Sequence, residues 1–293
     1  MKIQSKYRIT GILFLLPSFI IYICVFFYPL FFCFVNSFAR VNIILGSRTF
    51  IGLRNYSNLI NRADFILAVK VTIKYVVMLV PALMVIALWV ANTVSRMKPK
   101  AAGISTTLIF LPFMVAMVSA GIIWDWVLDP NFGIVNTILR TLGAVQVPGW
   151  LRVSETALLS TVIISIWIRC PFSIMILYGG MKNVPEELYE AAELDGINSF
   201  QRFFRLTMPL INPQLVLALT LDMIFAFRAF DQIYAVINGG APAPAVRTVM
   251  VYLISNVFTE NYGMASAITI LMLFSLFAIS LLQQALLKRV VEY

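Results

Sequence analysis

A dense group of carboxylates is the first feature of this sequence that could carry chemistry. Five of its thirteen acidic residues fall within ten positions, namely Glu186, Glu187, Glu190, Glu193 and Asp195. Clustered carboxylates act as acids, bases or metal ligands when a nucleophile or further ligands accompany them. The sequence has no histidine, and its three cysteines lie apart in apolar segments. Histidine-dependent catalysis and cysteine or histidine metal clusters are therefore excluded, and neither a metal site nor a catalytic site is predicted.

The spacing of the same residues predicts a short helix. Asn183 precedes Glu186 by three residues, which is the spacing of a capping box, and Pro185 suits a first helical turn. Gly196 follows the acidic run and predicts a left-handed stop. A second helix is expected from about Ser199 through Thr207, ending at Pro209.

The two faces of the predicted acidic helix differ in chemistry. Residues three and four positions apart share a face, which sets Glu186, Glu190 and Glu193 against Leu188, Ala191, Ala192 and Asp195. Small alanines let a partner's backbone approach closely, and the charges give the contact its register. The helix is therefore interpreted as a docking element. A solvated loop helix with no partner is the alternative.

The remainder of the chain indicates a membrane protein. Of its 293 residues, 61% are hydrophobic and only 12% are charged, which is too little charge for the surface of a soluble domain. About 20 apolar residues cross roughly 30 Å of hydrocarbon as a helix. The sequence therefore predicts one all-α integral membrane domain over residues 1–293. It has a polar loop at 182–209 and six spans, approximately at 9–36, 69–94, 104–128, 156–177, 214–237 and 264–287.

Charges near the spans predict the orientation. The first span follows Lys2, Lys6 and Arg8, is too long for a signal peptide and has no small-residue cleavage site after it, so an uncleaved helix is expected. An even number of spans puts both termini on one side. Lysine and arginine are densest on the side that holds the termini and the 182–209 loop, which is therefore predicted to be cytoplasmic. The net charge of +9 is spread over helix ends, so nucleic acid is not a predicted partner.

Polar residues in the fifth predicted span are candidates for a pathway through the membrane. Arg228, Asp231 and Gln232 are three and four positions apart and would share a face of a continuous helix. Charges inside a membrane are costly, so they are paired or functional. Asp222 is expected to point elsewhere. A purely structural ion pair between Arg228 and Asp231 is the alternative.

Further candidates lie in the third, fourth and fifth spans. Arg169 precedes Pro171, and we expect its guanidinium to meet carbonyls that the proline frees, with an anionic substrate group as the alternative. Aromatic rings bind the apolar faces of sugars, although Trp124 and Trp126 also suit a membrane interface. The aromatic and adjacent acidic pathway candidates are Phe227, Tyr234, Trp124 and Asp125.

The loop also carries a known signature. Glu190-Ala191-Ala192, three residues, Gly196, nine residues and then Leu206-Thr207-Met208-Pro209 resembles the Glu-Ala-Ala loop of ATP-binding-cassette (ABC) importer permeases. The family usually ends this signature with Ile-x-Leu-Pro, and Leu206 and Met208 are conservative apolar departures. Other stretches are similar to the carbohydrate-uptake, MalF-like, binding-protein-dependent branch: Phe50-Ile51-Gly52-Leu53-Arg54-Asn55-Tyr56, Leu111-Pro112, Asp129-Pro130-Asn131-Phe132-Gly133, Pro185-Glu186-Glu187-Leu188-Tyr189, Phe230-Asp231 and Asn238-Gly239-Gly240.

This resemblance implies a fold and a set of partners. The fold would be that of a type I importer permease, in the bacterial cytoplasmic membrane. The partners would be a second homologous permease, two ATPase subunits, an extracytoplasmic solute-binding protein and membrane lipid. The acidic helix would be the coupling helix that docks on an ATPase, with the implied coupling residues Glu186, Glu187, Glu190, Ala191, Ala192, Asp195, Gly196 and Pro209. The chain has no Gly-x-x-x-x-Gly-Lys-Ser/Thr motif, so it is expected to bind no cofactor itself, and ATP and Mg²⁺ would belong to the ATPases.

The predicted function is transport of a sugar or oligosaccharide, coupled to ATP hydrolysis by the separate ATPases. Within the family, the alternative is an anionic or phosphorylated solute, such as an acidic oligosaccharide or glycerol phosphate, for which Arg228 and Arg169 offer contacts. Outside the family, an integral-membrane transferase is disfavoured because the acidic residues lack a nucleophile or a metal-ligand set. A channel is disfavoured because no filter segment is present.

Overall fold

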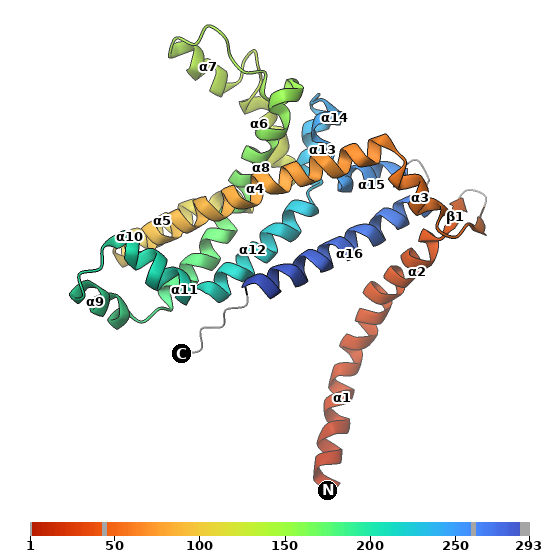
Figure 1. Ribbon diagram of the computed structural model, residues 1–293, viewed down its shortest axis with the longest axis horizontal. Coiled ribbons are helices and arrows are strands. Elements are labelled where there is room, and N and C mark those ends of the chain that lie inside the picture. The colour runs from red at the N-terminus through yellow and green to blue at the C-terminus, as the bar shows by residue number, and fades with distance from the viewer. Residues whose placement is uncertain (1, 43–45, 259–261, 288–293) are drawn as a thin grey trace. The chain divides into compact units, whose positions relative to one another are not determined.

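The computed structural model describes residues 2–42, 46–258 and 262–287 (Figure 1). These residues form α-helices and one small β-hairpin, which confirms the predicted all-α membrane fold apart from the hairpin. The chain divides into two compact units. Unit 1 is Met1–Ala63 with Leu253–Ser275, and unit 2 is Asp64–Tyr252 with Leu276–Tyr293. The C-terminal residues 288–293, whose charges entered the orientation prediction, lie outside the described residues.

Unit 1 is an apolar helix followed by a hairpin. Its elements are α1 (Lys2–Tyr22), the π-helical turn η1 (Ile23–Phe27), α2 (Tyr28–Ser37), β1 (Ala39–Asn42), β2 (Ser47–Phe50), α3 (Arg54–Ile60) and the first part of α16 (Tyr262–Leu287). The strands pair antiparallel with Ala39 opposite Phe50. Asn55 fixes α3 beneath the hairpin by donating to the carbonyls of Ser37 and Ala39, at 2.9 and 3.0 Å. The hairpin and these contacts were not predicted from the sequence.

Unit 2 contains the longer helices and all the candidate site residues. Its elements are α4 (Ala63–Ser95), α5 (Pro99–Phe110), η2 (Leu111–Met114), α6 (Met117–Val127), α7 (Ile134–Thr141), η3 (Trp150–Arg152), α8 (Ser154–Lys182), α9 (Glu186–Leu194), α10 (Ser199–Arg202), η4 (Phe203–Thr207), α11 (Met208–Leu210), α12 (Asn212–Phe227), α13 (Asp231–Asn238), α14 (Ala243–Val246) and α15 (Val249–Phe258), which continues into unit 1. Figure 1 shows α9 and α10 at one end of this unit and α7 at the other.

The core of unit 2 forms where α4 and α8 bury matching faces. On α4 the fully buried residues Tyr75, Leu79 and Leu83 recur every four positions, as the inward stripe of a helix requires. Ile164 and Ile168 of α8 are buried in the same cluster. Because this stripe is continuous over several turns, α4 and α8 form a firm frame for the polar residues described below.

Long apolar helices lie at each of the six predicted spans. Five helical stretches are long and apolar enough to cross a membrane, namely Ile12–Ser37, Ala63–Ser95, Ser154–Lys182, Asn212–Asn238 and Tyr262–Gln283. The third predicted span is instead a pair of helices, Pro99–Met114 and Met117–Val127, that meet at 95°. The number of spans is six if this pair counts as one, and the predicted count of six remains a prediction.

The bend in the third span has a local cause. Pro112 lacks a backbone N–H and cannot continue the hydrogen-bond ladder. Val115 and Ala116 then adopt extended conformations, with ψ of 130° and 137°. The bend brings α6 close against α13, where a Cβ on Gly121 would lie 2.7 Å from the Cβ of Ala235. Continuous helicity from 104 to 128 was therefore the wrong expectation.

Candidate functional site

The acidic helix begins two residues later than its capping signal predicted. α9 starts at Glu186 directly after Pro185, and no side chain caps its first turn. Asn183 instead terminates α8, so the predicted capping box between Asn183 and Glu186 is wrong. The reason is that α8 runs on to Lys182 and uses Asn183 as its own C-cap. A true capping box forms further along, where Asn198 accepts from the backbone N–H of Gln201 at 2.8 Å.

The predicted stop at Gly196 is confirmed by the backbone. Gly196 has φ of +72°, in the left-handed region. Its N–H donates to the carbonyl of Glu193, and the N–H of Ile197 donates to that of Ala192, both at 3.1 Å. This pair of bonds is a Schellman ending, which satisfies carbonyls that the helix leaves free. Nothing lies within 4 Å of a Cβ built at Gly196, so backbone conformation alone requires glycine here.

The two alanines of the signature do not share a face. Ala192 is buried at 6% exposure, whereas Ala191 is exposed. Leu194 next to them is 90% exposed. The predicted small apolar stripe is therefore wrong, because only Ala192 is buried against the rest of unit 2. The outward surface of α9 mixes apolar and acidic side chains, with Glu186, Glu187, Glu190, Ala191, Leu194 and Asp195 exposed.

A salt bridge braces α9 against the helix that follows it. Arg202 of α10 pairs with Glu193 of α9, and its guanidinium lies 6.0 Å from the ring centre of Tyr189. Glu193 is thus already engaged in an ion pair within the chain, whereas Glu190 forms no ion pair among the described residues. The second helix also differs from expectation, since α10 continues through the π-helical turn η4 and α11 past Pro209 to Leu210. The wider π-turn precedes the proline and accommodates its missing N–H.

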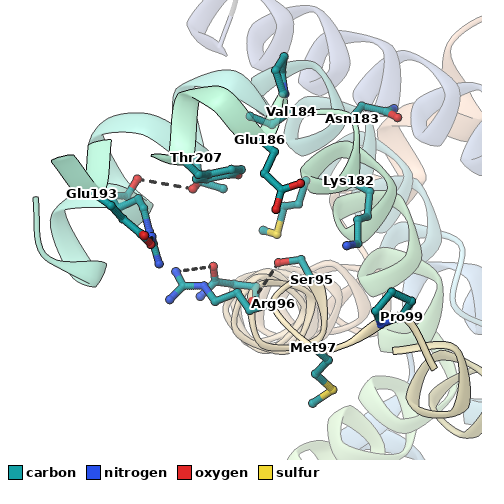
Figure 2. A pocket seen from close by; sticks show the side chains of 15 residues that line it. Ser95, Arg96, Met97, Pro99, Lys182, Asn183, Val184, Glu186, Glu193 and Thr207 are labelled. Carbon is teal, nitrogen blue, oxygen red and sulfur yellow. Dashed lines mark hydrogen bonds and ion pairs between the residues drawn. The ribbon is translucent and has the colours of Figure 1, made fainter. Parts of the chain in front are cut away.

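A large cavity lies between this loop and the ends of two spans. It has a volume of about 770 Å³, and Figure 2 shows Glu186, Lys182 and Arg96 around it. We call it the loop cavity. It is lined by Asn92, Ser95, Arg96, Met97, Pro99, Met181, Lys182, Asn183, Val184, Pro185, Glu186, Tyr189, Glu193, Arg202 and Thr207. The pKa of Arg96 is lowered, first by partial burial and then by the nearby positive charge of Arg202.

A second, smaller cavity lies where the fifth predicted span breaks. α12 ends at Phe227 and α13 begins at Asp231, so Arg228, Ala229 and Phe230 form a non-helical link. We call the adjacent space of about 300 Å³ the break cavity. It is lined by Met117, Arg169, Leu221, Ile224, Phe225, Arg228, Ala229, Phe230, Asp231 and Gln232. Arg228, Asp231 and Gln232 are thus gathered by a broken helix, and the predicted shared face of a continuous one is wrong.

No hydrogen bond or ion pair joins Arg228 to Asp231 in the described part of the chain, and both side chains are exposed. Gln232 is buried at 1% exposure. Its Nε2 donates to the Tyr75 hydroxyl at 3.3 Å and to Ser165 Oγ at 3.4 Å. Its Oε1 has no partner among the described residues. Gln232 lines the break cavity, and this oxygen is a buried acceptor behind its wall.

Arg169 and Asp222, which the sequence placed apart, are bonded to each other. Arg169 Nε donates to Asp222 Oδ1 at 3.1 Å, and Ser173 Oγ lies 2.8 and 2.7 Å from the two carboxylate oxygens. Arg169 also lies over the Phe172 ring, 4.1 Å from its centre. Asp222 does not line the break cavity with Arg228, Asp231 and Gln232, so the expectation that it points elsewhere is confirmed. The expectation that Arg169 meets backbone carbonyls is wrong, because its partner is this carboxylate. No local pattern in the sequence indicates a pair 53 residues apart.

The remaining pathway candidates lie away from the break cavity or are already engaged. Asp125 accepts two hydrogen bonds from Arg152, at 2.6 and 3.0 Å. Trp124 packs edge-on against Trp167, with ring centres 5.8 Å apart. Tyr234 stacks on Phe230 at 5.1 Å, next to the cavity. Phe227 is half-buried and packs on the core. Within the described ranges, no three His, Cys, Asp or Glu side chains are grouped to hold a metal.

Several helices that are long and apolar enough to cross a membrane, with polar and charged residues gathered where one of these stretches breaks, define a multi-pass membrane protein. Residues 72–292 match the family described as the binding-protein-dependent transport system inner membrane component. The chain belongs to this family. It is therefore a multi-pass component of the bacterial inner membrane and a permease subunit of an ABC importer, not an enzyme.

Individual relatives cover nearly the whole chain. The trehalose/maltose transport system permease protein MalF of Thermococcus litoralis is 30% identical over 270 residues, which are 92% of this chain and 90% of that one. A bacterial ABC transporter that imports the acidic polysaccharide alginate has a TM-score of 0.86 at 19% identity, with both chains fully covered. A bacterial alginate ABC transporter in complex with an alginate pentasaccharide-bound periplasmic protein has a TM-score of 0.83 at 20% identity, covering 98% of this chain and 96% of that one. At these identities the two structures establish the fold.

Proposed function

We propose that this permease subunit carries a sugar or oligosaccharide, and that the solute passes the break cavity. The observation that supports this most directly is the wall of that cavity. Its lining includes the charged residues Arg228 and Asp231, the amide residue Gln232 and the ring of Phe230. A saccharide site needs polar groups that hydrogen-bond to the sugar hydroxyls. It also needs an aromatic ring that packs on the apolar face of the sugar. The trehalose/maltose relative supports the same class of solute.

The proposal includes the partners that the fold lacks. Two ATPase subunits would bind ATP and Mg²⁺, and the exposed surface of α9 would dock on one of them through Glu186, Glu187, Glu190, Ala191, Asp195 and the turn at Gly196. Pro209 would fix the return of the chain toward α12. A second homologous permease would complete the pathway, and a solute-binding protein would deliver the solute, as the complexed alginate transporter suggests. Both termini and α9 would face the cytoplasm.

Two buried glutamines allow a matched test of the solute site. Gln232 and Gln283 each have an unpartnered Oε1 among the described residues, but only Gln232 lines the break cavity. We expect Gln232→Leu to raise the half-saturating solute concentration in uptake assays about tenfold, the effect of losing one good hydrogen bond. Gln283→Leu should leave that concentration unchanged. Equal effects of both substitutions would mean that the break cavity does not contact the solute.

An anionic solute is a second candidate, because two arginines line the break cavity. Asp222 already balances Arg169, whereas Arg228 has no carboxylate bonded to it in the described part of the chain. Uptake of a neutral gluco-oligosaccharide and of an oligouronate would be compared in wild type and Arg228→Gln. Loss of oligouronate uptake alone would favour the anionic solute. Unchanged uptake of both would remove Arg228 from the site.

Copurification tests the assembly independently of the solute. The tagged chain, extracted in mild detergent from its host, should retain an ATPase and a second permease, and ATP with vanadate should strengthen the ATPase contact. Glu190→Lys on the exposed face of α9 should weaken ATPase retention, while Lys98→Gln on the α4–α5 turn serves as a surface control. Recovery of the chain alone under all conditions would contradict the proposed coupling role.

A further inference from the structure

Positive side chains from three separate elements converge on the loop cavity. Arg96 comes from the turn after α4, Lys182 from the last residue of α8, and Arg202 from α10. Figure 2 shows Arg96 across the cavity from Lys182 and Glu186. The cavity volume of about 770 Å³ is within the range of small-molecule sites. The three cations therefore line one cavity, unlike the charges that are scattered over the other helix ends.

These cations are not equally neutralised. Arg202 is paired with Glu193. Among the described residues, the Arg96 side chain donates only to the neutral amide oxygen of Asn92, in the last turn of α4, at 3.0 Å. Lys182 forms no ion pair in the described part of the chain. Two of the three positive groups therefore have unused capacity to bind an anion. The pKa of Arg96 is lowered first by its partial burial and then by the positive charge of Arg202.

The carboxylates that face the cavity are Glu186 and Glu193. Glu193 is held by Arg202 on the α10 side, which leaves Glu186 as the one carboxylate without an ion pair among the described lining residues. Counting these groups, the lining carries three positive and two negative charges. The net charge is positive, and the positive groups span opposite walls. An anion in the cavity is therefore attracted from both walls, and Glu186 opposes it from one position only.

The cavity also lies at a particular depth. The apolar helices α4 and α8 end at Ser95 and Lys182, so Arg96 and Lys182 mark the ends of two membrane-spanning segments. Residues at span ends lie at the level of phospholipid headgroups. Basic pockets between helices at the cytoplasmic side bind phosphate groups of anionic lipids, and arginine binds phosphate oxygens in bidentate fashion.

We propose that the loop cavity binds a phosphate group between Arg96 and Lys182, supplied either by the headgroup of an anionic phospholipid or by a soluble phosphate. A phosphate there would bridge the α4–α5 turn to the end of α8 directly before α9. Occupancy of the site would stiffen the base of the acidic helix. The proposal concerns a different cavity from the solute site and stands without the identity of the solute.

The full-length chain in nanodiscs allows a direct test. Nanodiscs of phosphatidylcholine with and without phosphatidylglycerol would be compared, and lipid retained after detergent release would be measured by native mass spectrometry. We expect wild type to retain phosphatidylglycerol in preference to phosphatidylcholine, and Arg96→Gln with Lys182→Gln to reduce that retention about tenfold. Glu186→Gln should increase retention, because it removes the opposing charge.

The control removes equal charge from the same turn. Lys98 and Lys100 are exposed and do not line the cavity, so Lys98→Gln with Lys100→Gln should leave retention unchanged. If phosphatidylglycerol shows no preference but inorganic phosphate raises the unfolding temperature of wild type and not of the Arg96/Lys182 variant, the site binds soluble phosphate. Equal loss in the control variant, or binding of neither probe by wild type, would overturn the proposal. If the double variant does not fold, the single variant Lys182→Gln should also reduce phosphatidylglycerol retention, and this is then the quantity to measure.

Discussion

Asp222 of α12 is completely buried and is held by Arg169 of α8 at 3.1 Å, across 53 positions of sequence. Ser173, one turn after Arg169, bonds to the same carboxylate. The two helices on either side of the acidic loop are therefore locked together by charge inside the membrane. Arg169 also lines the break cavity, so this residue belongs both to the buried ion pair and to the proposed solute path.

Removing one member of this pair should destabilise the protein strongly. Asp222→Asn leaves the guanidinium of Arg169 with no counter-charge, and breaking a buried pair costs about 3 kcal/mol. Thermal unfolding in detergent would measure the loss. The double variant Arg169→Gln with Asp222→Asn should lose less than the sum of the two single variants. Simple additivity would show that the two residues do not interact.

Gly196→Ala should weaken the end of α9. A left-handed conformation costs a residue with a side chain about 1 kcal/mol, and no neighbouring atom opposes the new methyl group. Hydrogen exchange of the amides of Gly196 and Ile197 would report the loss locally. Gly103→Ala is the matched control, because Gly103 is helical with equally open surroundings and should gain slight stability. A loss at both positions would point to a general effect of the added methyl group.

Gly121→Ala should separate α6 from α13. The added Cβ would lie 2.7 Å from the Cβ of Ala235 and 3.0 Å from the carbonyl oxygen of Gln232, closer than packed atoms allow. Overpacking of this kind costs roughly 1 to 3 kcal/mol. The unfolding temperature should fall, and Ala235→Gly should restore part of it. No rescue by Ala235→Gly would mean that the backbone contact at Gln232 dominates.

The Asp125–Arg152 pair should contribute constant stability near neutral pH. The hydrogen bonds to Asp125 raise the pKa of Arg152 above its ordinary value. A raised pKa in the folded state gives stabilisation that is complete below the ordinary value and is lost only as the pH rises through the folded one. Arg152→Gln should therefore cost about 1 kcal/mol for this partly exposed pair, equally at pH values of about 6 and about 9. A cost that changes over this range would require another titrating group.

Local signals in the sequence were sufficient for the spans and for the end of α9. Apolar runs predicted where the long helices lie, because length and hydrophobicity are properties of one segment. Gly196 predicted the left-handed stop for the same reason. The start of α9 was predicted incorrectly, since Asn183 fits either the end of one helix or the start of the next, and only the length of α8 decides between them.

Contacts between distant segments could not be predicted. Nothing near Arg169 indicates that Asp222 will face it, because the pairing depends on how α8 and α12 are rotated. The same limit applies to the hydrogen bonds from Gln232 to Tyr75 and Ser165. The break at Arg228 escaped prediction for another reason. No proline or glycine marks it, and the fit of α13 against Gly121 of α6 accompanies it.

The bend after Pro112 has a consequence for the life of this chain before assembly. Leu111 and Met114 are 52% and 75% exposed, so large apolar side chains lie at the surface next to peptide groups that have left the helical ladder. Hydrocarbon offers such groups no hydrogen-bond partner, and they are tolerated only under protein or water. A newly inserted chain without its partner subunits is therefore not stably folded in the membrane at this bend. We expect cells to degrade the orphan quickly, so that the amount of partner sets the amount of this subunit.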